Sequence, residues 1–206
     1  MTVQHTPAPV RSDLSPALSN ASHVRRPYRL QGTMLTVGAL SWAASQAAFG
    51  IDGDSDLALA LGGLGSGLFQ VGLLSLLVVL YRSRALGTGR LARFFLRAEA
   101  VLVTFAIGST IADAVQVSDL DRAGWAMLDA FWPFSMLGMF AIAVRIAIAG
   151  RWHGAARFWP LVAESWALVV IPTMGAFGST AATVVSIVHL SVGYAVLGQI
   201  VARKQD

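Results

Sequence analysis

Five ionisable side chains interrupt long apolar runs of this sequence, and their types could support proton or cation chemistry. They are Glu99, Asp113, Asp129, Glu164 and His189. Inside a bilayer each such group costs roughly 3 kcal/mol unless it is paired, hydrated or protonated. Their positions predict Asp113 and Asp129 near one membrane surface, and Glu99 with Glu164 near the other. With His189 near the midplane, we expect a polar path that passes protons or coordinates a cation.

The polar residues of the third apolar run are predicted to share one helix face. Glu99 and Asp113 are separated by about four helical turns, which places them within about 40° of each other. Thr110 lies between them in the sequence. Hydrocarbon would leave these groups without hydrogen-bond partners, so we expect this face to point into the bundle.

Asp113 and Asp129 are expected to form a coupled pair in which at least one pKa is raised. They lie at similar depth on consecutive antiparallel helices, and two carboxylates in contact cannot both ionise cheaply. The alternative is that each carboxylate is a local anchor. Glu99 and Glu164 would then pair with arginines at the headgroups, and Asp129 would stabilise the N-terminus of its helix.

Pro133 is predicted to kink the helix that carries Asp129. A proline has no backbone N–H to donate, so the carbonyl four residues earlier, which belongs to Asp129, is left free. That residue would then offer an ion both a carboxylate and a backbone oxygen. The alternative is that Pro133 serves packing alone, as prolines in membrane helices often do.

His189 is the only histidine within the apolar runs. Its imidazole could exchange protons near neutral pH, or it could be hydrogen-bonded to a neighbouring helix. A single embedded histidine excludes a haem held by two histidines of one chain. The only lysine, Lys204, lies outside the runs, which excludes a retinal Schiff base, and the absence of cysteine excludes thiolate metal sites. We therefore expect no cofactor and assign no metal-ligating or catalytic residue.

Small residues open the second apolar run, at Gly62, Gly63, Ser66 and Gly67. A phosphate-binding glycine loop is excluded, because no strand precedes this segment and no lysine follows it. Small residues spaced four positions apart let two helix backbones touch. We expect close helix packing at this segment.

The elements that must position these residues are membrane helices. The chain has 206 residues, 55% of them hydrophobic and 13% charged, with a mean hydropathy of +0.64, whereas soluble domains carry about 25% charged residues. A polar tail with several prolines, residues 1–29, is predicted to be disordered. The apolar runs that follow cover residues 30–50, 57–81, 94–117, 125–149, 158–174 and 181–201. They predict an all-α fold, a bundle of six transmembrane helices over residues 30–202 with a short tail at 203–206.

The distribution of charge predicts the orientation of this bundle. All but one of the 15 Lys and Arg residues lie on one side, and Arg122 alone lies on the other, with Asp52, Asp54, Asp119 and Asp121. By the positive-inside rule both termini are cytoplasmic. The Arg-rich, Lys-poor composition is typical of a GC-rich bacterial genome, so we expect a multi-pass protein of a bacterial plasma membrane. Its cytoplasmic face should contact anionic lipid, and nucleic acid is not an expected partner.

These observations favour a small carrier or proton-linked permease that uses its intramembrane carboxylates and His189. The alternative is an accessory or scaffold subunit without enzymatic activity, which would use the small-residue stripe to pair with a second copy or another membrane protein. A membrane-embedded enzyme that modifies lipids ranks third, because no recognised catalytic constellation accompanies the carboxylates.

Overall fold

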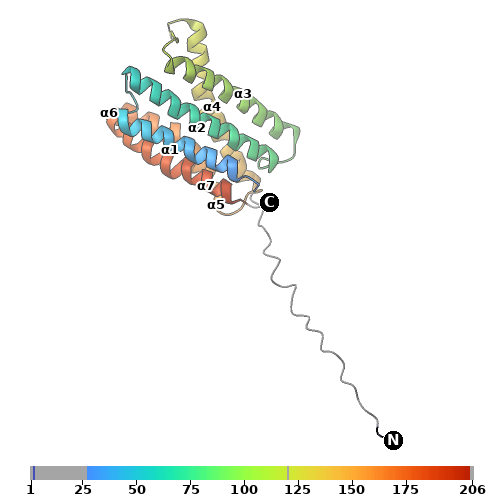
Figure 1. The fold of residues 1–206 in the computed structure, drawn as a ribbon. Helices are drawn as coiled ribbons and strands as arrows, with labels where there is room; N and C mark the ends of the chain where they lie inside the picture. Colours follow the sequence, from blue (N-terminus) through green and yellow to red (C-terminus); the bar gives the residue numbers. More distant parts are fainter. Residues whose placement is uncertain (1, 3–26, 120, 205–206) are drawn as a thin grey trace.

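The computed structural model describes residues 2, 27–119 and 121–204, and this part of the chain is all-α, with no strand. The tail predicted to be disordered, apart from residues 2 and 27–29, lies outside the described residues, as do the last two residues of the chain. The elements are α1 (Arg29–Phe49), α2 (Asp56–Arg82), α3 (Arg90–Ala114), α4 (Ala123–Ala149), α5 (Ala155–Glu164), α6 (Trp166–His189), the π-helix η1 (Leu190–Tyr194) and α7 (Ala195–Arg203). Figure 1 shows α1 between α2 and α7, with α3 on the far side of α2.

Four helical stretches in the described residues are long and apolar enough to cross a membrane. They are α2, α3, α4 and the stretch Ala155–Arg203 that runs from α5 to α7. Large apolar side chains such as Leu91, Phe134 and Phe177 are exposed on the outside of the bundle, where hydrocarbon would cover them. The chain is therefore a multi-pass membrane protein by length and composition, and lipid is its surrounding solvent.

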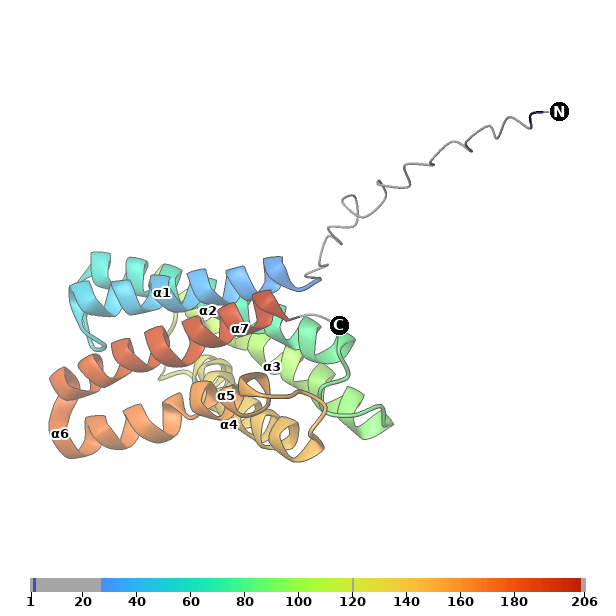
Figure 2. The same cartoon turned by 90° about the horizontal axis from the view of Figure 1, so that it is seen from below.

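Gly178 reverses the direction of α6. Its φ of 83° and ψ of 177° are not helical, and a glycine adopts this conformation without the steric cost that a Cβ would bring. Figure 2 shows the two legs on either side of the reversal lying next to each other. The indole Nε1 of Trp166 on the first leg donates a hydrogen bond of 2.9 Å to Ser186 Oγ on the second. The two legs therefore pack as a helical hairpin.

One end of the bundle carries the start of α1, the end of α7 and most of the described Arg and Lys residues (Figure 1), and we call it the basic end. Trp152 Nε1, from the connection after α4, donates to Ser83 Oγ, from the connection after α2, at 3.1 Å. The Lys204 ammonium lies over the rings of Tyr28, at 5.8 Å, and of Trp152, at 5.9 Å. These contacts join the two connections, the start of α1 and the end of α7 into one surface.

The opposite end carries the aspartates of the loops, and we call it the acidic end. There the backbone N–H of Ile51 donates to Thr183 Oγ1 at 3.0 Å, which ties the α1–α2 connection to the second leg of α6. Arg122, the one described Arg or Lys at this end, pairs with Asp119 at 2.9 Å. The basic residues at one end and the aspartates at the other agree with the way the charged residues alternate between successive connections in the sequence.

Candidate functional site

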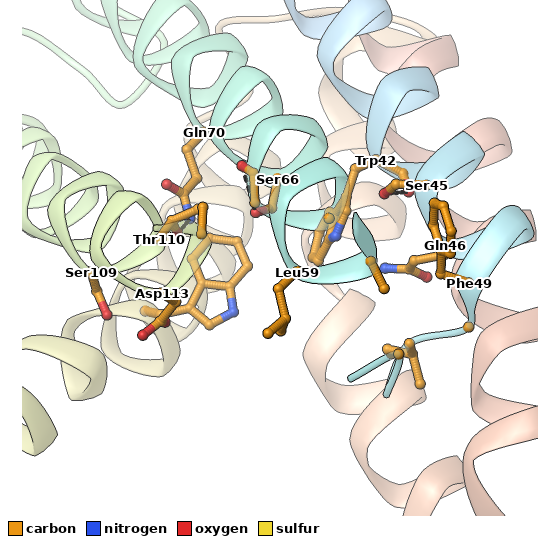
Figure 3. A pocket seen from close by; sticks show the side chains of 18 of the residues that line it. Trp42, Ser45, Gln46, Phe49, Leu59, Ser66, Gln70, Ser109, Thr110 and Asp113 are labelled. Atoms are coloured by element: carbon orange, nitrogen blue, oxygen red, sulfur yellow. Dashed lines mark hydrogen bonds between the residues drawn. The ribbon is translucent and has the colours of Figure 1, made fainter. Parts of the chain in front are cut away.

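A cavity of about 310 Å³ opens at the acidic end, and we call it the acidic-end cavity. Four helices line it. In Figure 3, Gln46 of α1 lies on one side, and Gln70 of α2 and Asp113 of α3 lie on the other. Asp129 of α4 completes the lining. The cavity therefore combines carboxylates and carboxamides from helices that are distant in the sequence.

The carboxylates come from facing ends of α3 and α4. Asp113 lies in the last turn of α3 and Asp129 near the start of α4, and both are half-buried. Ser109 Oγ donates a hydrogen bond of 3.4 Å to Asp129 Oδ1. Both side chains line the acidic-end cavity, whereas their direct coupling stays a prediction. Pro133 lies inside α4, one turn after Asp129, and the helix continues through it.

The carboxamides are the least satisfied polar groups of the cavity. Gln46 is 3% exposed, and neither its Nε2 nor its Oε1 has a hydrogen-bond partner among the described residues. Gln70 is 1% exposed; its Nε2 donates to Thr110 Oγ1 at 2.7 Å, and its Oε1 has no partner there. Buried polar atoms are almost always paired in folded proteins. Unpaired polar atoms are therefore buried at the wall of this cavity.

Aromatic rings connect the cavity to the centre of the bundle. Trp42 and Trp132 both line the cavity, with ring centroids 5.7 Å apart. The Trp42 ring stacks on Phe69 at 5.1 Å, and Phe69 packs edge-on against Tyr194 at 4.7 Å. The hydroxyl of Tyr194 donates to Glu164 Oε2 at 2.8 Å. A continuous chain of contacts thus runs from the acidic-end cavity to the Glu164 carboxyl group.

Glu164 and His189 lie at the junction of α5, α6 and η1. Glu164 is 2% exposed, and its Oε1 has no partner among the described residues. The His189 ring lies with Nε2 3.0 Å from the carbonyl oxygen of Ala163, so that nitrogen donates and carries the proton. Trp159 Nε1 donates to the carbonyl of Gly193, in the π-helix, at 2.9 Å. The bond of His189 to a neighbouring helix is the arrangement that the sequence left as an alternative.

Glu99 occupies a separate space near the basic end. It is 3% exposed, and its Oε1 has no hydrogen-bond partner among the described residues. Gly138 of α4 makes room for this carboxyl group, because a Cβ there would collide with Oε2. Glu99 lines a second hollow of about 560 Å³ between α3 and α4, which we call the basic-end pocket.

The five ionisable candidates therefore divide into groups instead of lining one cavity. Asp113 and Asp129 line the acidic-end cavity, and Glu99 lines the basic-end pocket. Glu164 lines a narrow space that shares Ile142 with the basic-end pocket. The sequence pointed to the carboxylates by their apolar surroundings. Gln46 was not predicted, although a glutamine in an apolar run was a signal of the same kind.

The small residues of α2 have different surroundings. Gly63 packs directly against Ala114 of α3, and a Cβ on Gly62 or Gly67 would meet no atom within 4 Å. Ser66 Oγ donates to the carbonyl of Gly63 at 3.3 Å. Gly62, Gly63 and Ser66 line the acidic-end cavity, so their small size also leaves its volume open.

The acidic-end cavity contains hard oxygen atoms and aromatic faces but no compact set of metal ligands. Within the residues that the structure describes, no three His, Asp or Glu side chains lie close enough together to hold a metal ion. Comparison of the chain with protein-family models, with curated proteins and with solved structures gave no match. Function must therefore be argued from the geometry of the site itself.

Proposed function

We propose that this protein is a small carrier that exchanges an organic cation for protons across a membrane. The observation that carries the proposal is the acidic-end cavity, which brings Asp113 and Asp129 together with the unpartnered carboxamide of Gln46. A cavity of about 310 Å³ has room for a cation of the size of choline and several waters. We place the outer binding site in this cavity.

Charge and aromatic faces favour a positively charged solute over an anion or a sugar. The carboxylates of Asp113 and Asp129 supply negative charge, and the rings of Trp42 and Trp132 in the lining belong to the residue type that attracts cations most strongly. The free Nε2 and Oε1 of Gln46 can hydrogen-bond a hydroxyl or amine of the same ligand. A carboxylate can bind a cation or a proton but not both at once. This competition is the basis of exchange.

The interior provides a second set of groups for the proton. In this proposal Glu164, which accepts from Tyr194, and Glu99 hold protons on the way to the basic end, and His189 passes them near the centre. The aromatic contacts between Trp42, Phe69 and Tyr194 fill the space where α1, α2 and η1 meet. An occluded carrier needs such packing, because no continuous channel may join its two sides.

We further propose that the chain crosses the bilayer six times with the basic end in the cytoplasm. Gly178 would divide α6 between the fifth and sixth crossings, and α1 would be the first. A thiol introduced by Ser118→Cys at the acidic end should react with an impermeant reagent in intact cells, and one introduced by Thr88→Cys at the basic end should not. Reaction of Thr88→Cys alone would reverse the orientation.

The transport proposal is tested with purified protein in vesicles loaded with a pH-sensitive dye and held at an acidic internal pH. External choline or guanidinium should raise the internal pH, and glycerol should not. Asp113→Asn and Asp129→Asn should each abolish this response, since each removes a carboxylate of the exchange site, and His189→Ala should slow it. Asp54→Asn, an exposed loop carboxylate, is the matched control and should keep full activity.

Two results would overturn the transport proposal. One is a folded, monodisperse wild-type protein that moves no protons with either cation. The other is proton movement that persists in the Asp113→Asn and Asp129→Asn variants at the wild-type rate, because the acidic-end cavity would then play no part.

A second candidate function, a scaffold subunit, is favoured by one observation. An open groove of about 360 Å³ between α1 and α2 is lined by small residues, among them Ser41, Ala44, Ala48 and Gly65. Small side chains of this kind allow a further helix to approach closely. If Ala44→Phe converts a dimer in native mass spectrometry to a monomer and leaves cation exchange intact, the groove is an assembly surface in addition to the carrier.

A further inference from the structure

The basic-end pocket is an apolar hollow whose mouth faces the surroundings of the bundle. Its volume is about 560 Å³, and its walls come from α3, α4 and the connection before α3. Leu91 and Phe94 at its rim are 67% and 64% exposed. In a membrane these side chains contact lipid, so a ligand can enter the pocket from the bilayer and not only from water.

A single carboxyl group interrupts the apolar lining. Glu99 is 3% exposed, lines the pocket, and leaves Oε1 without a hydrogen-bond partner among the described residues. The nearby α4 residue is Gly138, which keeps the space for this carboxyl group free of any side chain. Leu102 and Ile142 complete the apolar surroundings. A buried carboxyl group at the wall of an apolar hollow calls for a donor, since its desolvation is otherwise uncompensated.

The other charged group of the lining is the guanidinium of Arg145. Arg145 is exposed and reaches the connection at Gly87. The structure records no ion pair between Arg145 and Glu99. A ligand between them would meet a carboxyl group at the buried side and a guanidinium near the rim.

We propose that the basic-end pocket binds an amphiphilic amine that enters from the bilayer. Its apolar body packs against residues such as Phe95 and Leu102, and its ammonium group donates a hydrogen bond to the carboxyl group of Glu99. A lipid acyl chain is a less suitable ligand, because its methyl end offers the Glu99 carboxyl group no hydrogen-bond donor. This inference is separate from the transport proposal, because binding is measured without any flux.

The test compares three probes with one aromatic body and different head groups. They are 2-(1-naphthyl)ethylamine, the neutral 2-(1-naphthyl)ethanol and the anionic 3-(1-naphthyl)propionate. Each is titrated calorimetrically into the full chain in lipid nanodiscs, and the heat of empty nanodiscs is subtracted. A hydrogen bond to a charged group is worth about 1.5–3 kcal/mol, so the amine should bind about 10- to 100-fold more tightly than the alcohol.

Two variants, Glu99→Gln and Ala141→Phe, separate the effect of charge from the effect of pocket volume, and Asp54→Asn is the control. Glu99→Gln should remove the preference for the amine and bring it within about threefold of the alcohol, because an amide carries no charge. Asp54→Asn, which removes one negative charge from the acidic end, should keep the preference. Ala141→Phe, at an exposed position of the lining, fills the pocket without touching the carboxyl group and should weaken all three probes.

Every other result overturns the inference. Equal binding of amine and alcohol to the wild type would mean an apolar hollow with no cation site. Tightest binding of the propionate, lost in Arg145→Gln, would mean an anion site at the rim. Amine binding that survives Glu99→Gln but is lost in Asp113→Asn would move the ligand to the acidic-end cavity, and the transport proposal would gain from that result.

Discussion

The half of the bundle built from α1, α2 and α7 packs differently from the half built from α3 and α4. In the first half, helix backbones touch through glycines. A Cβ on Gly198 of α7 would lie 2.6 Å from the carbonyl oxygen of Gly32 in α1, and one on Gly38 of α1 would lie 2.5 Å from that of Leu68 in α2. Between α3 and α4 the close approach is made by a side chain, the carboxyl group of Glu99 against Gly138.

The two halves also divide the functional groups. The carboxamides of Gln46 and Gln70 lie in the backbone-packed half, whereas Glu99, Asp113 and Asp129 lie on α3 and α4. Backbone contacts have little freedom to rearrange, and side-chain contacts have more. A movement of α3 and α4 against the other half would separate the carboxylates from the carboxamides and leave the glycine contacts intact. Under the transport proposal, α3 and α4 would be the moving part.

The largest effect on stability is expected from Gly198→Val, which disrupts the contact between α7 and α1 in the backbone-packed half. The new side chain would collide with the Gly32 carbonyl and with Thr36 of α1. We expect the free energy of unfolding to fall by about 3 kcal/mol, at the upper end of the cost of overpacking. Thermal unfolding of the purified protein in detergent measures it.

Gly108→Val in α3 is the matched control, because no atom lies within 4 Å of the position of its Cβ. It should change the free energy of unfolding by less than about 0.5 kcal/mol, the difference in helix propensity between Gly and Val. Equal losses for the two variants would show that the contrast between the halves is wrong.

A smaller effect is expected from Tyr194→Phe, at the contact between η1 and α5. The substitution removes the one hydrogen bond that the buried carboxyl group of Glu164 accepts from a side chain of the described residues. Leaving that group unpartnered should cost about 2 kcal/mol in the free energy of unfolding. Tyr81→Phe, at an exposed hydroxyl that accepts from Arg97 at 3.4 Å, should have almost no effect. A Tyr194→Phe protein as stable as wild type would show that the bond from Tyr194 does not stabilise the buried carboxyl group of Glu164.

The smallest effect on stability is expected from Gln46→Leu, which tests the cavity itself. Both polar atoms of Gln46 are buried without a partner, so an apolar side chain of similar size should leave stability unchanged or raise it by up to about 1 kcal/mol. Cation exchange should fall at the same time. Gln70→Leu breaks the bond to Thr110 and should lose about 1 kcal/mol. A stable Gln46→Leu protein with full exchange would contradict a binding role for this residue.

The helical nature of the chain could be predicted from composition and run length, because hydrocarbon leaves a backbone few other ways to satisfy its polar groups. The boundaries of the first four runs lie close to those of α1 to α4. The break at Ser165 between α5 and α6 and the π-helix at Leu190–Tyr194 could not be predicted. They depend on contacts between distant residues, such as the bond from Trp159 to Gly193.

The candidate site was predictable in its residue types and less so in its grouping. Isolated carboxylates in apolar runs are conspicuous, and Asp113 and Asp129 do line one cavity. Which of the other groups join them depends on helix rotation and on small residues such as Gly138. A sequence does not display those features directly. The same holds for the unpartnered state of Gln46, which is a property of its neighbours.

The most direct test of the carrier account is whether the two hollows respond to each other. The chain has no cysteine, so a single thiol introduced by Ser66→Cys reports on the acidic-end cavity, and one introduced by Ala98→Cys reports on the basic-end pocket. Reaction rates with a charged thiol reagent are measured in detergent with and without the cation that drives proton exchange. The account predicts that the cation slows the reaction of the thiol in Ser66→Cys and speeds the reaction of the thiol in Ala98→Cys. An unchanged or slower rate at Ala98→Cys would contradict it, because binding at one end would then not open the other.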